Sequence, residues 1–357
     1  MCETCAMNDD LHLEVDHLDI ASPATTVFDF DYTDGREQLL RLYDKGTRRQ
    51  WIGSDRLDWS HDVDLDNPVG WPDDLIPIYG TAWWNKMTEA EHGNLRRHVE
   101  AWRFSQFMHG EQGALMCAAK IVQTVPDLDS KFYAATQVID EARHVEVYSR
   151  YLHEKIQLVY PLNQHLESLL DDVITDARWD MTYLGMQVII EGLALAAFSV
   201  IRNLATDPLA RALNAYVMQD EARHVTFGRL ALRDYYPQLS DAERDEREQF
   251  CVDACYLMRD RFLGEEIWPR VGLPPEVGEY VEHSEVMRNF RSFLFMRIVP
   301  ILREIGLWGP RIRGAFDDMG VLAFADADLD AEMANDEAAA QEFDAQMAHV
   351  QAVAAEA

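Results

Sequence analysis

DEARH stands at residues 140–144 and again at 220–224, and a further glutamate precedes each copy at the same interval. Glu111 lies thirty residues before Glu141, and Glu191 lies thirty residues before Glu221. In a helix, residues i and i+3 share one face, so each Glu-x-x-His presents a carboxylate and an imidazole toward one point. Two such helices, with one glutamate from each of two others, supply the ligands of a two-metal centre in a four-helix bundle. The predicted metal ligands are Glu111, Glu141, His144, Glu191, Glu221 and His224.

The surroundings of these glutamates predict that they are buried. At helical spacing from Glu111 and Glu191 the chain is mostly apolar: Phe104, Phe107, Met108, Leu115, Ala118 and Val122 around the first, and Leu184, Gln187, Val188, Leu195 and Phe198 around the second. Four buried carboxylates without counter-ions are costly to desolvate or take up protons, whereas two divalent cations neutralise them. The alternative, exposed and salt-bridged helix faces, does not account for the duplicated spacing.

Composition predicts an all-α protein and excludes several partners. The 357 residues are rich in helix formers and poor in alternating β-branched runs. A net charge of −31 argues against nucleic acid and anionic membrane surfaces. The most apolar stretch, residues 192–201, is too short for a membrane span, and the start of the chain resembles no secretory signal, so a cytoplasmic location is expected. The single Cys-x-x-Cys of Cys2 and Cys5 cannot form a four-thiolate site alone, and a redox role for it stays open.

Three parts follow along the chain. Residues 1–36 are acidic and irregular, residues 37–313 form the helical metal-binding domain, and residues 314–357 are an acidic, alanine-rich tail without Lys or Arg, helical in part or disordered.

Capping boxes at Thr88-x-x-Glu91 and Ser240-x-x-Glu243 start two helices. The chain has no phosphate loop and no HExxH or GxSxG motif, so no nucleotide or flavin site is expected. The expected helices cover 37–47, 88–122, 130–159, 163–204 and 208–235, then one from Ser240 and one or two more between 275 and 305.

The ligand set resembles the carboxylate-bridged di-iron oxygenases and oxidases of the ferritin-like superfamily. It is most similar to hydroxylase subunits of bacterial multicomponent monooxygenases and to benzoyl-CoA epoxidase, on residues 37–236. The resemblance implies a ferritin-like four-helix bundle with flanking helices, two iron ions, O₂ as co-substrate, and electrons from a separate reductase. The residues that carry it are GEQGA at 110–114, the two Asp-Glu-x-Arg-His motifs, and Lys45, Gln50, Trp51, Asp58 and Trp59.

In that group, the aspartate and arginine of each motif form a network around the ligating histidine. By position these residues are Asp140, Arg143, Asp220 and Arg223. Asp140 lies one turn before His144, so either it or a carboxylate of the neighbouring helix is expected to orient the free ring N–H. Leu195 departs from the monooxygenases, which usually carry a threonine one turn after the glutamate equivalent to Glu191.

A second resemblance is to ribonucleotide reductase small subunits. Tyr148 follows His144 by four residues, where those proteins carry a radical tyrosine, and Trp51 resembles the tryptophan of their radical path. Against this, those subunits generally have aspartate where Glu111 stands, and residues 314–357 contain no Tyr or Trp to pass a radical onward. A radical-generating or ligand-binding oxidase therefore stays as an alternative, with Tyr148 as an ordinary core residue in the main interpretation. A storage or peroxide-scavenging protein is a further alternative, disfavoured by chain length.

The main hypothesis is an O₂-dependent oxygenase that hydroxylates, epoxidises or N-oxygenates an apolar or aromatic small molecule. The same oxygen and imidazole ligands also accept a Mn/Fe pair, and the sequence leaves a homodimer open. Ordinary core packing explains each candidate pocket residue equally well. The residues expected around the substrate are Phe107, Gly110, Ala114, Leu115, Met186, Ile190, Ala194, Leu195 and Phe227.

Overall fold

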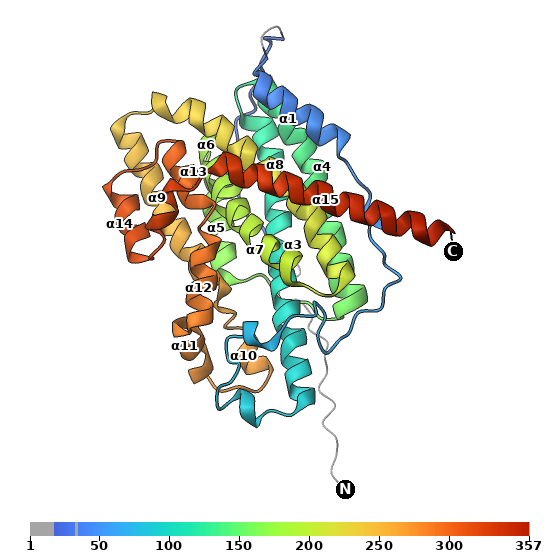
Figure 1. Ribbon diagram of the computed structural model, residues 1–357. Coiled ribbons are helices and arrows are strands. Elements are labelled where there is room, and N and C mark those ends of the chain that lie inside the picture. The colour runs from blue at the N-terminus through green and yellow to red at the C-terminus, as the bar shows by residue number, and fades with distance from the viewer. Residues whose placement is uncertain (1–17, 33–34, 357) are drawn as a thin grey trace.

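The computed structural model describes residues 18–32 and 35–356, so Cys2 and Cys5 lie outside the described residues. All long elements among these residues are helices, and the described residues contain no strand. Figure 1 shows the helices gathered around the long α3, with α15 crossing one face of the molecule. The all-α prediction is confirmed.

Two helical hairpins form the centre. The first is α3 (Glu89–Thr124) with α4 (Leu128–Arg150), and the second is α7 (Glu191–Leu204) with α8 (Pro208–Tyr235). The capping box at the start of α3 is present, because the Thr88 hydroxyl accepts from the Glu91 N–H and the Thr88 N–H donates to the Glu91 carboxylate. The Asp207 side chain caps α8, whose first residue is a proline, as helix N-termini favour.

The expected helix over 163–204 is interrupted, and that prediction was wrong. It divides into α5 (Gln164–Thr175), α6 (Trp179–Tyr183), the π-helical segment η4 (Leu184–Ile190) and α7. The Asp176 carboxylate accepts from the backbone N–H of Arg178 at 2.8 Å, a local bond that competes with helix formation. Lys120 of α3 donates to the carbonyl oxygens of Ile174 and Asp176, at 2.8 and 2.5 Å, and so satisfies the end of α5.

The expected helix over 130–159 also changes type before its end. After Arg150 the chain continues as the π-helical segment η3 (Tyr151–Ile156) and stops at Gln157, whose φ of 57° is left-handed. Arg97 of α3 donates to the carbonyl oxygens of Ile156 and Gln157, both at 2.9 Å. These bonds fix the end of the first hairpin.

The helical stretch Trp179–Leu204, which carries Glu191, is more apolar than the sequence interpretation allowed. An 18-residue window within its 26 residues has a mean hydropathy of 1.9, so the stretch is long and apolar enough to cross a membrane by length and composition alone. The expectation that no stretch reaches that length was therefore wrong. Of its most apolar window, 83% is buried inside the bundle, which is what the central helix of a helical bundle also shows.

Further helices flank this bundle. Ser240 and Glu243 form the expected capping box of α9, and three helices rather than one or two lie between residues 275 and 305. The flanking helices are α1 (Glu37–Arg48), α2 (Gly53–Arg56), α9 (Asp241–Asp260), α10 (Ile267–Arg270), α11 (Glu276–His283), α12 (Glu285–Leu294), α13 (Ile298–Glu304), α14 (Pro310–Asp318) and α15 (Leu329–Glu356).

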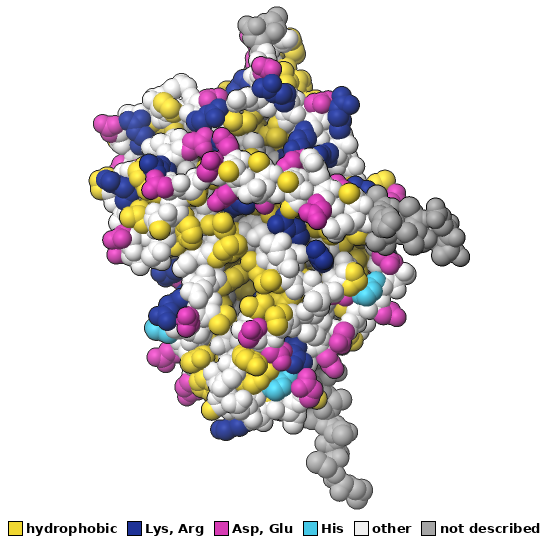
Figure 2. Space-filling model, in the orientation of Figure 1, with side chains coloured by type: hydrophobic (Ala, Val, Ile, Leu, Met, Phe, Trp, Pro, Cys, Tyr) yellow, Lys and Arg dark blue, Asp and Glu magenta, His cyan; other side chains and the backbone are white. Residues whose placement is uncertain are grey.

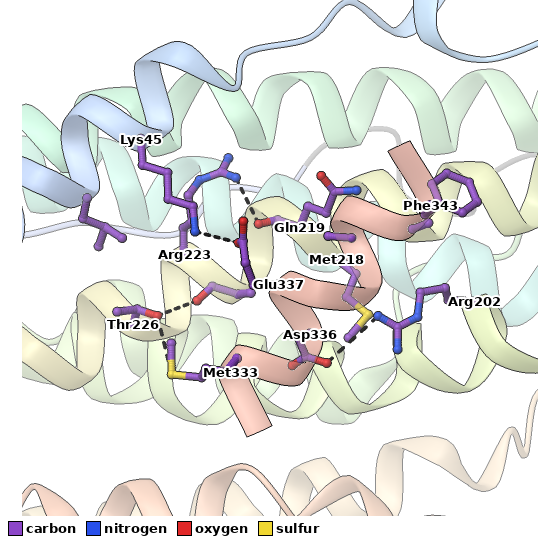
Figure 3. Close-up of a pocket in the computed structure, with 15 residues that line it drawn as sticks. Lys45, Arg202, Met218, Gln219, Arg223, Thr226, Met333, Asp336, Glu337 and Phe343 are labelled. Atoms are coloured by element: carbon purple, nitrogen blue, oxygen red, sulfur yellow. Dashed lines mark hydrogen bonds and ion pairs between the residues drawn. The ribbon is translucent and has the colours of Figure 1, made fainter. Parts of the chain in front are cut away.

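Helix α15 lies across α8 and forms ion pairs with the bundle (Figure 1). Glu337 contacts Lys45 at 2.7 Å and Arg49 at 2.6 Å, and Asp336 contacts Arg297 at 2.7 Å. A cavity of about 270 Å³ remains between α15 and the bundle, and the Lys45–Glu337 ion pair forms part of its lining (Figure 3). Most of the acidic tail, residues 329–356, is thus a helix that forms ion pairs with basic residues of the bundle.

Candidate metal centre

The structure brings the six predicted ligands together from four helices. Glu111 comes from α3, Glu141 and His144 from α4, Glu191 from the start of α7, and Glu221 and His224 from α8. All six side chains are buried. Ligand atoms of Glu111, Glu141, His144 and Glu221 lie within 4.8 Å of one another, and so do those of Glu141, Glu191 and His224. Glu141 belongs to both groups, so the cluster offers two adjoining cation positions.

The donor atoms of this cluster fit two cations. The Nδ1 atom of His144 lies 3.2 Å from both Glu111 and Glu221, and that of His224 lies 3.1 Å from Glu141. Four carboxylate oxygens have no hydrogen-bond partner among the described residues, namely Oε2 of Glu141, Oε2 of Glu191 and both oxygens of Glu221. An unpaired buried acceptor costs about 1–3 kcal/mol. Two divalent cations satisfy these oxygens and cancel their charge.

Without cations, Glu111, Glu191 and the two histidines favour their protonated forms, because their pKa values are raised. Burial raises the pKa of Glu111 and of Glu191 well above the usual range, and the negative charge of Glu221 raises both further. Burial acts to lower the pKa of His144, but the Glu111 carboxylate outweighs it and the pKa is raised. Metal uptake must therefore displace protons from this site.

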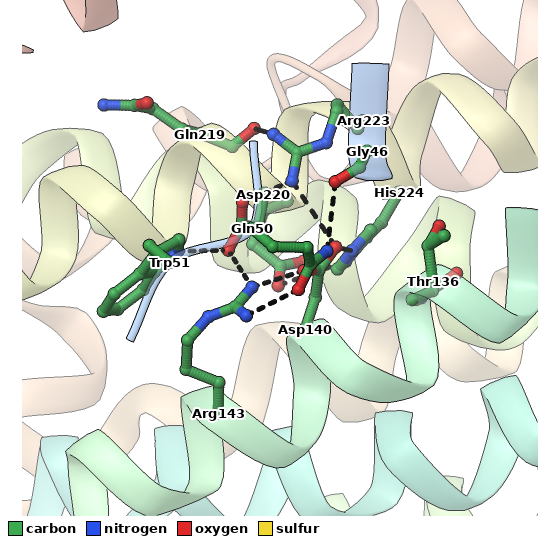
Figure 4. Close-up of polar contacts among 12 residues, drawn as sticks. Gly46, Gln50, Trp51, Thr136, Asp140, Arg143, Gln219, Asp220, Arg223 and His224 are labelled. Atoms are coloured by element: carbon green, nitrogen blue, oxygen red, sulfur yellow. Dashed lines mark hydrogen bonds and ion pairs between the residues drawn. The ribbon is translucent and has the colours of Figure 1, made fainter. Parts of the chain in front are cut away.

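The outer nitrogens of the two histidines are held by aspartates in a crossed arrangement. His144 Nε2 lies 3.1 Å from Asp220 Oδ2. His224 Nε2 lies 3.2 Å from Asp140 Oδ2 (Figure 4). Of the two options that the sequence left open, the structure has the carboxylate of the neighbouring helix. Each aspartate thus supports the histidine of the other motif, and each ring directs Nδ1 toward the carboxylates.

Two arginines tie these aspartates together. Arg143 pairs with Asp140 of its own helix and reaches Asp220 at 3.1 Å, while Arg223 pairs with Asp220 and reaches Asp140 at 3.4 Å (Figure 4). Burial acts to raise the pKa of Asp220, but the charge of Arg223 and the hydrogen bond with His144 lower it. Asp220 therefore stays ionised and accepts a hydrogen bond from the Nε2–H group of His144.

Two residues before the bundle complete the network. Gln50 donates to Asp140 Oδ1 at 2.8 Å and accepts from Arg143 at 2.7 Å. Trp51 donates its indole N–H to Asp220 Oδ2 at 2.8 Å, and the Arg143 guanidinium lies 4.8 Å from the centre of its ring. The sequence resemblance included both residues but gave them no contacts.

Sequence reasoning missed Gln137. Its amide donates to Oε1 of Glu141 at 3.0 Å and to Oε1 of Glu191 at 2.7 Å, and the side chain is fully buried. Gln137 lies one turn before Glu141, so a search for polar residues on the ligand face of that helix finds it. By holding one oxygen of each glutamate, it leaves the unpaired Oε2 of each for a cation.

Tyr148 is a buried residue with a satisfied hydroxyl. The hydroxyl donates to Asn214 Oδ1 at 3.1 Å, and the Asn214 amide donates to the Ala210 carbonyl at 2.8 Å. Burial raises the pKa of Tyr148 well above its usual value. Its ring packs against Phe104, Phe107 and Phe198. These contacts match the interpretation of Tyr148 as a core residue.

The nine residues expected around a substrate occupy the core or its edge. Phe107 packs edge-on against Phe198 at 4.8 Å, and Phe227 packs against Tyr133 at 4.4 Å. Gly110, Leu115 and Ala194 are half-buried, and the other six are buried. The cavities of about 270 and 370 Å³ in the described part of the chain are lined by other residues. A substrate pocket at the nine positions stays a prediction.

Comparison with solved structures bears on the fold. The dimanganese(II) NrdF of Streptococcus sanguinis is similar over 84% of this chain and 99% of its own, with 14% sequence identity and a TM-score of 0.52. A mutant R2-like ligand-binding oxidase with an anaerobically reconstituted Mn/Fe cofactor is similar over 78% of this chain and 96% of its own, with 16% identity and a TM-score of 0.50. These likenesses confirm the ferritin-like helical fold. No curated protein sequence matches.

A family model supplies the more specific result. The model described as p-aminobenzoate N-oxygenase AurF matches residues 33–306, which is most of the chain and includes all six clustered glutamates and histidines. The expectation of a di-iron enzyme is thereby confirmed at the level of the family. The protein is a di-iron oxidoreductase and belongs to the p-aminobenzoate N-oxygenase AurF family.

Proposed function

We propose that the protein uses O₂ to N-oxygenate a small aromatic amine, with electrons delivered by a separate reductase. The observation that carries this proposal is the buried cluster of four glutamates and two histidines within a chain of the N-oxygenase family. The reaction in the family's printed description supports an aromatic amine as the substrate class. The apolar residues around Glu111 and Glu191 favour a substrate that is uncharged where it meets the cluster.

Glu111, Glu141, His144, Glu191, Glu221 and His224 would hold the two metal ions. When bound, two iron ions supply the redox chemistry that O₂ reduction requires. The same donors accept manganese, so the choice between Fe/Fe and Mn/Fe depends on supply and geometry.

The chain's own residues would prepare this site in two ways. Asp140 and Asp220 hold the proton of each histidine on Nε2, which leaves each Nδ1 as a lone-pair donor. Gln137 fixes the carboxylates of Glu141 and Glu191 by donating to one oxygen of each. Ligands that are held before the metals arrive lose less entropy on binding.

An aromatic layer would exclude water from one side of the cluster. Phe107, Tyr148 and Phe198 pack on one another with ring centroids 4.8 to 6.1 Å apart, and all three are buried. Leu195 stands one turn after Glu191 and brings no hydroxyl. A low-polarity site of this kind strengthens electrostatic interactions with the reacting groups and limits side reactions with water.

The test is product analysis on the full chain. The protein is loaded with Fe(II) without oxygen, given an aromatic amine, then supplied with O₂ and a chemical reductant, and products are identified by mass spectrometry. We expect oxygen on the amine nitrogen, and no product from the Glu141→Ala variant. The exposed Glu146 lies on the same helix, so Glu146→Ala is the matched control and should retain turnover. Oxygen inserted only on carbon, or no product from metal-loaded protein across a broad amine panel, would contradict the proposal.

A further inference from the structure

A second cavity, of about 370 Å³, lies away from the metal ligands. It is bounded by α3, α10, α12 and the chain before α3, and Figure 2 shows a hollow edged with hydrophobic side chains beside α12. We call it the indole cavity, because three tryptophans line it together with three phenylalanines. These residues are Trp71, Trp102, Trp268, Phe262, Phe290 and Phe293.

Two of the three indole N–H groups in this cavity are without an acceptor. The Nε1 atoms of Trp71 and Trp268 are buried and have no hydrogen-bond partner among the described residues. Trp102 differs, because its Nε1 donates to Glu266 at 2.9 Å. A buried donor without a partner is costly, and each such case calls for a missing acceptor. A ligand that brings an acceptor oxygen supplies it.

The charges that line the cavity disfavour an anionic ligand. Arg103 and Asp74 are the charged residues among its lining. Arg103 is already engaged, since it donates to both oxygens of Glu100 at 3.0 Å and lies 4.1 Å from the centre of the Trp71 ring. The lining therefore keeps no unengaged cation for an anion, and the remaining walls suit a neutral, flat ring.

The cavity lies along the same helices as the metal centre. Arg103 and Val99 precede Glu111 on α3 by eight and twelve residues, and Val200 follows Glu191 on α7 by nine. At 1.5 Å per residue these separations are roughly 12 to 18 Å. Phe107 and Phe198, in contact with each other, occupy the intervening turns of the two helices. The aromatic layer thus separates the indole cavity from the cluster.

We propose that the indole cavity binds a neutral aromatic molecule that carries an acceptor oxygen, and that it receives the N-oxygenated product after the product passes the aromatic layer. The ligand class follows from the cavity itself, whereas its assignment to the product rests on the proposed function. An amine substrate chiefly offers donors, while a nitroso or nitro group offers the oxygens that two N–H groups require. The site should therefore distinguish product from substrate.

The test is ligand binding to the metal-free full chain, by calorimetry, with nitrobenzene and isopropylbenzene, an apolar analogue with the same number of heavy atoms, as probes. One site per chain is expected, with nitrobenzene about three- to tenfold tighter than isopropylbenzene, as one or two neutral hydrogen bonds provide. Trp268→Phe keeps an aromatic ring and removes the N–H, so it should lower that ratio toward one. Trp102→Phe is the matched control, because its N–H already has Glu266 as acceptor, and the ratio should persist.

A cavity-filling variant locates the site. Val200→Phe should weaken both probes together while the melting curve shows a folded protein. Equal affinity of the two probes in the wild type, an unchanged ratio in Trp268→Phe, or full binding in Val200→Phe would overturn the proposal. Because metal-free protein is used and no turnover is measured, these outcomes are independent of the amine oxygenation test.

Discussion

Asp220 of α8 accepts a hydrogen bond from His144 of α4, with Asp220 Oδ2 and His144 Nε2 3.1 Å apart. The complementary pair, Asp140 and His224, joins the same two helices in the opposite sense at 3.2 Å. Each DEARH motif therefore orients the metal-facing nitrogen of the other. The duplicated sequence works as one crossed unit rather than as two independent sites.

This crossing makes a prediction for the aspartates. Asp220→Asn removes the negative charge that holds the His144 proton on Nε2, and metal affinity should fall by about ten- to a hundredfold. The metal affinity of each variant is measured by competition with a chelator. Asp140→Asn should give a similar loss, whereas Asp234→Asn, on the exposed part of α8, should give none. An unchanged affinity in both buried variants would show that the aspartates do not position the histidines.

The protons of the metal-free site predict an unusual dependence of stability on pH. Glu111 and Glu191 have raised pKa values in the folded chain, so between their ordinary pKa and the raised one the folded state binds more protons than the unfolded state. Their stabilisation is present below the ordinary carboxylate pKa and is lost as pH rises through the raised pKa. The melting temperature of metal-free protein should therefore be lower at about pH 8 than at about pH 6.

The control for this prediction is the double variant Glu111→Gln, Glu191→Gln, which lacks both carboxylates. Its melting temperature should change less over the same interval. Metal-loaded wild type, in which cations replace the protons, should also lose the effect and melt higher than the metal-free protein. A metal-free wild type that becomes more stable with rising pH would contradict the assigned burial of these carboxylates.

Tyr148 separates an oxygenase from a radical protein. Tyr148→Phe keeps the ring among Phe104, Phe107 and Phe198 and removes the bond to Asn214, so it should cost about 1 kcal/mol in stability and leave turnover largely intact. Thermal unfolding and product formation check both parts. The alternative is tested by electron paramagnetic resonance after the protein has reacted with O₂. If the wild type shows a stable tyrosyl radical signal that the variant lacks, the radical-generating alternative is favoured.

Helix α15 should respond to salt. Burial acts to raise the pKa of Glu337, but hydrogen bonds and charge, chiefly from Lys45, lower it to about 2. Exposed and half-exposed ion pairs are weak and screened, at about 0–1 kcal/mol each. Amide exchange in α15 should therefore speed up in high salt and in Glu337→Gln, while the exposed Glu342→Gln should match wild type. Slow exchange in all conditions would mean that apolar contacts such as that of Phe343 with Tyr216 hold the helix.

The sequence predicts most of the centre because helical spacing alone places Glu141 beside His144 and Glu221 beside His224. The start of α8 follows as directly, since Asp207 and Pro208 form a strong start signal. The break after Thr175 was missed, because it depends on Lys120 reaching from another helix to the carbonyls of α5. Three other features were also not predicted: the partner of His144, the role of Gln137 and the indole cavity. Each depends on how different helices pack together, and the spacing of residues within one helix carries no information about that.

The central claim is that four glutamates and two histidines of this chain hold two metal ions. The most direct measurement is the metal content of the full chain after anaerobic loading with Fe(II) and removal of unbound metal, compared between wild type and Glu141→Ala. Because Glu141 belongs to both groups of ligand atoms, its loss should affect both positions. The account predicts about two ions per wild-type chain and a clear loss in the variant, in keeping with the family's two-metal bundle. Fewer than about one ion per wild-type chain, or equal content in the two proteins, would contradict it.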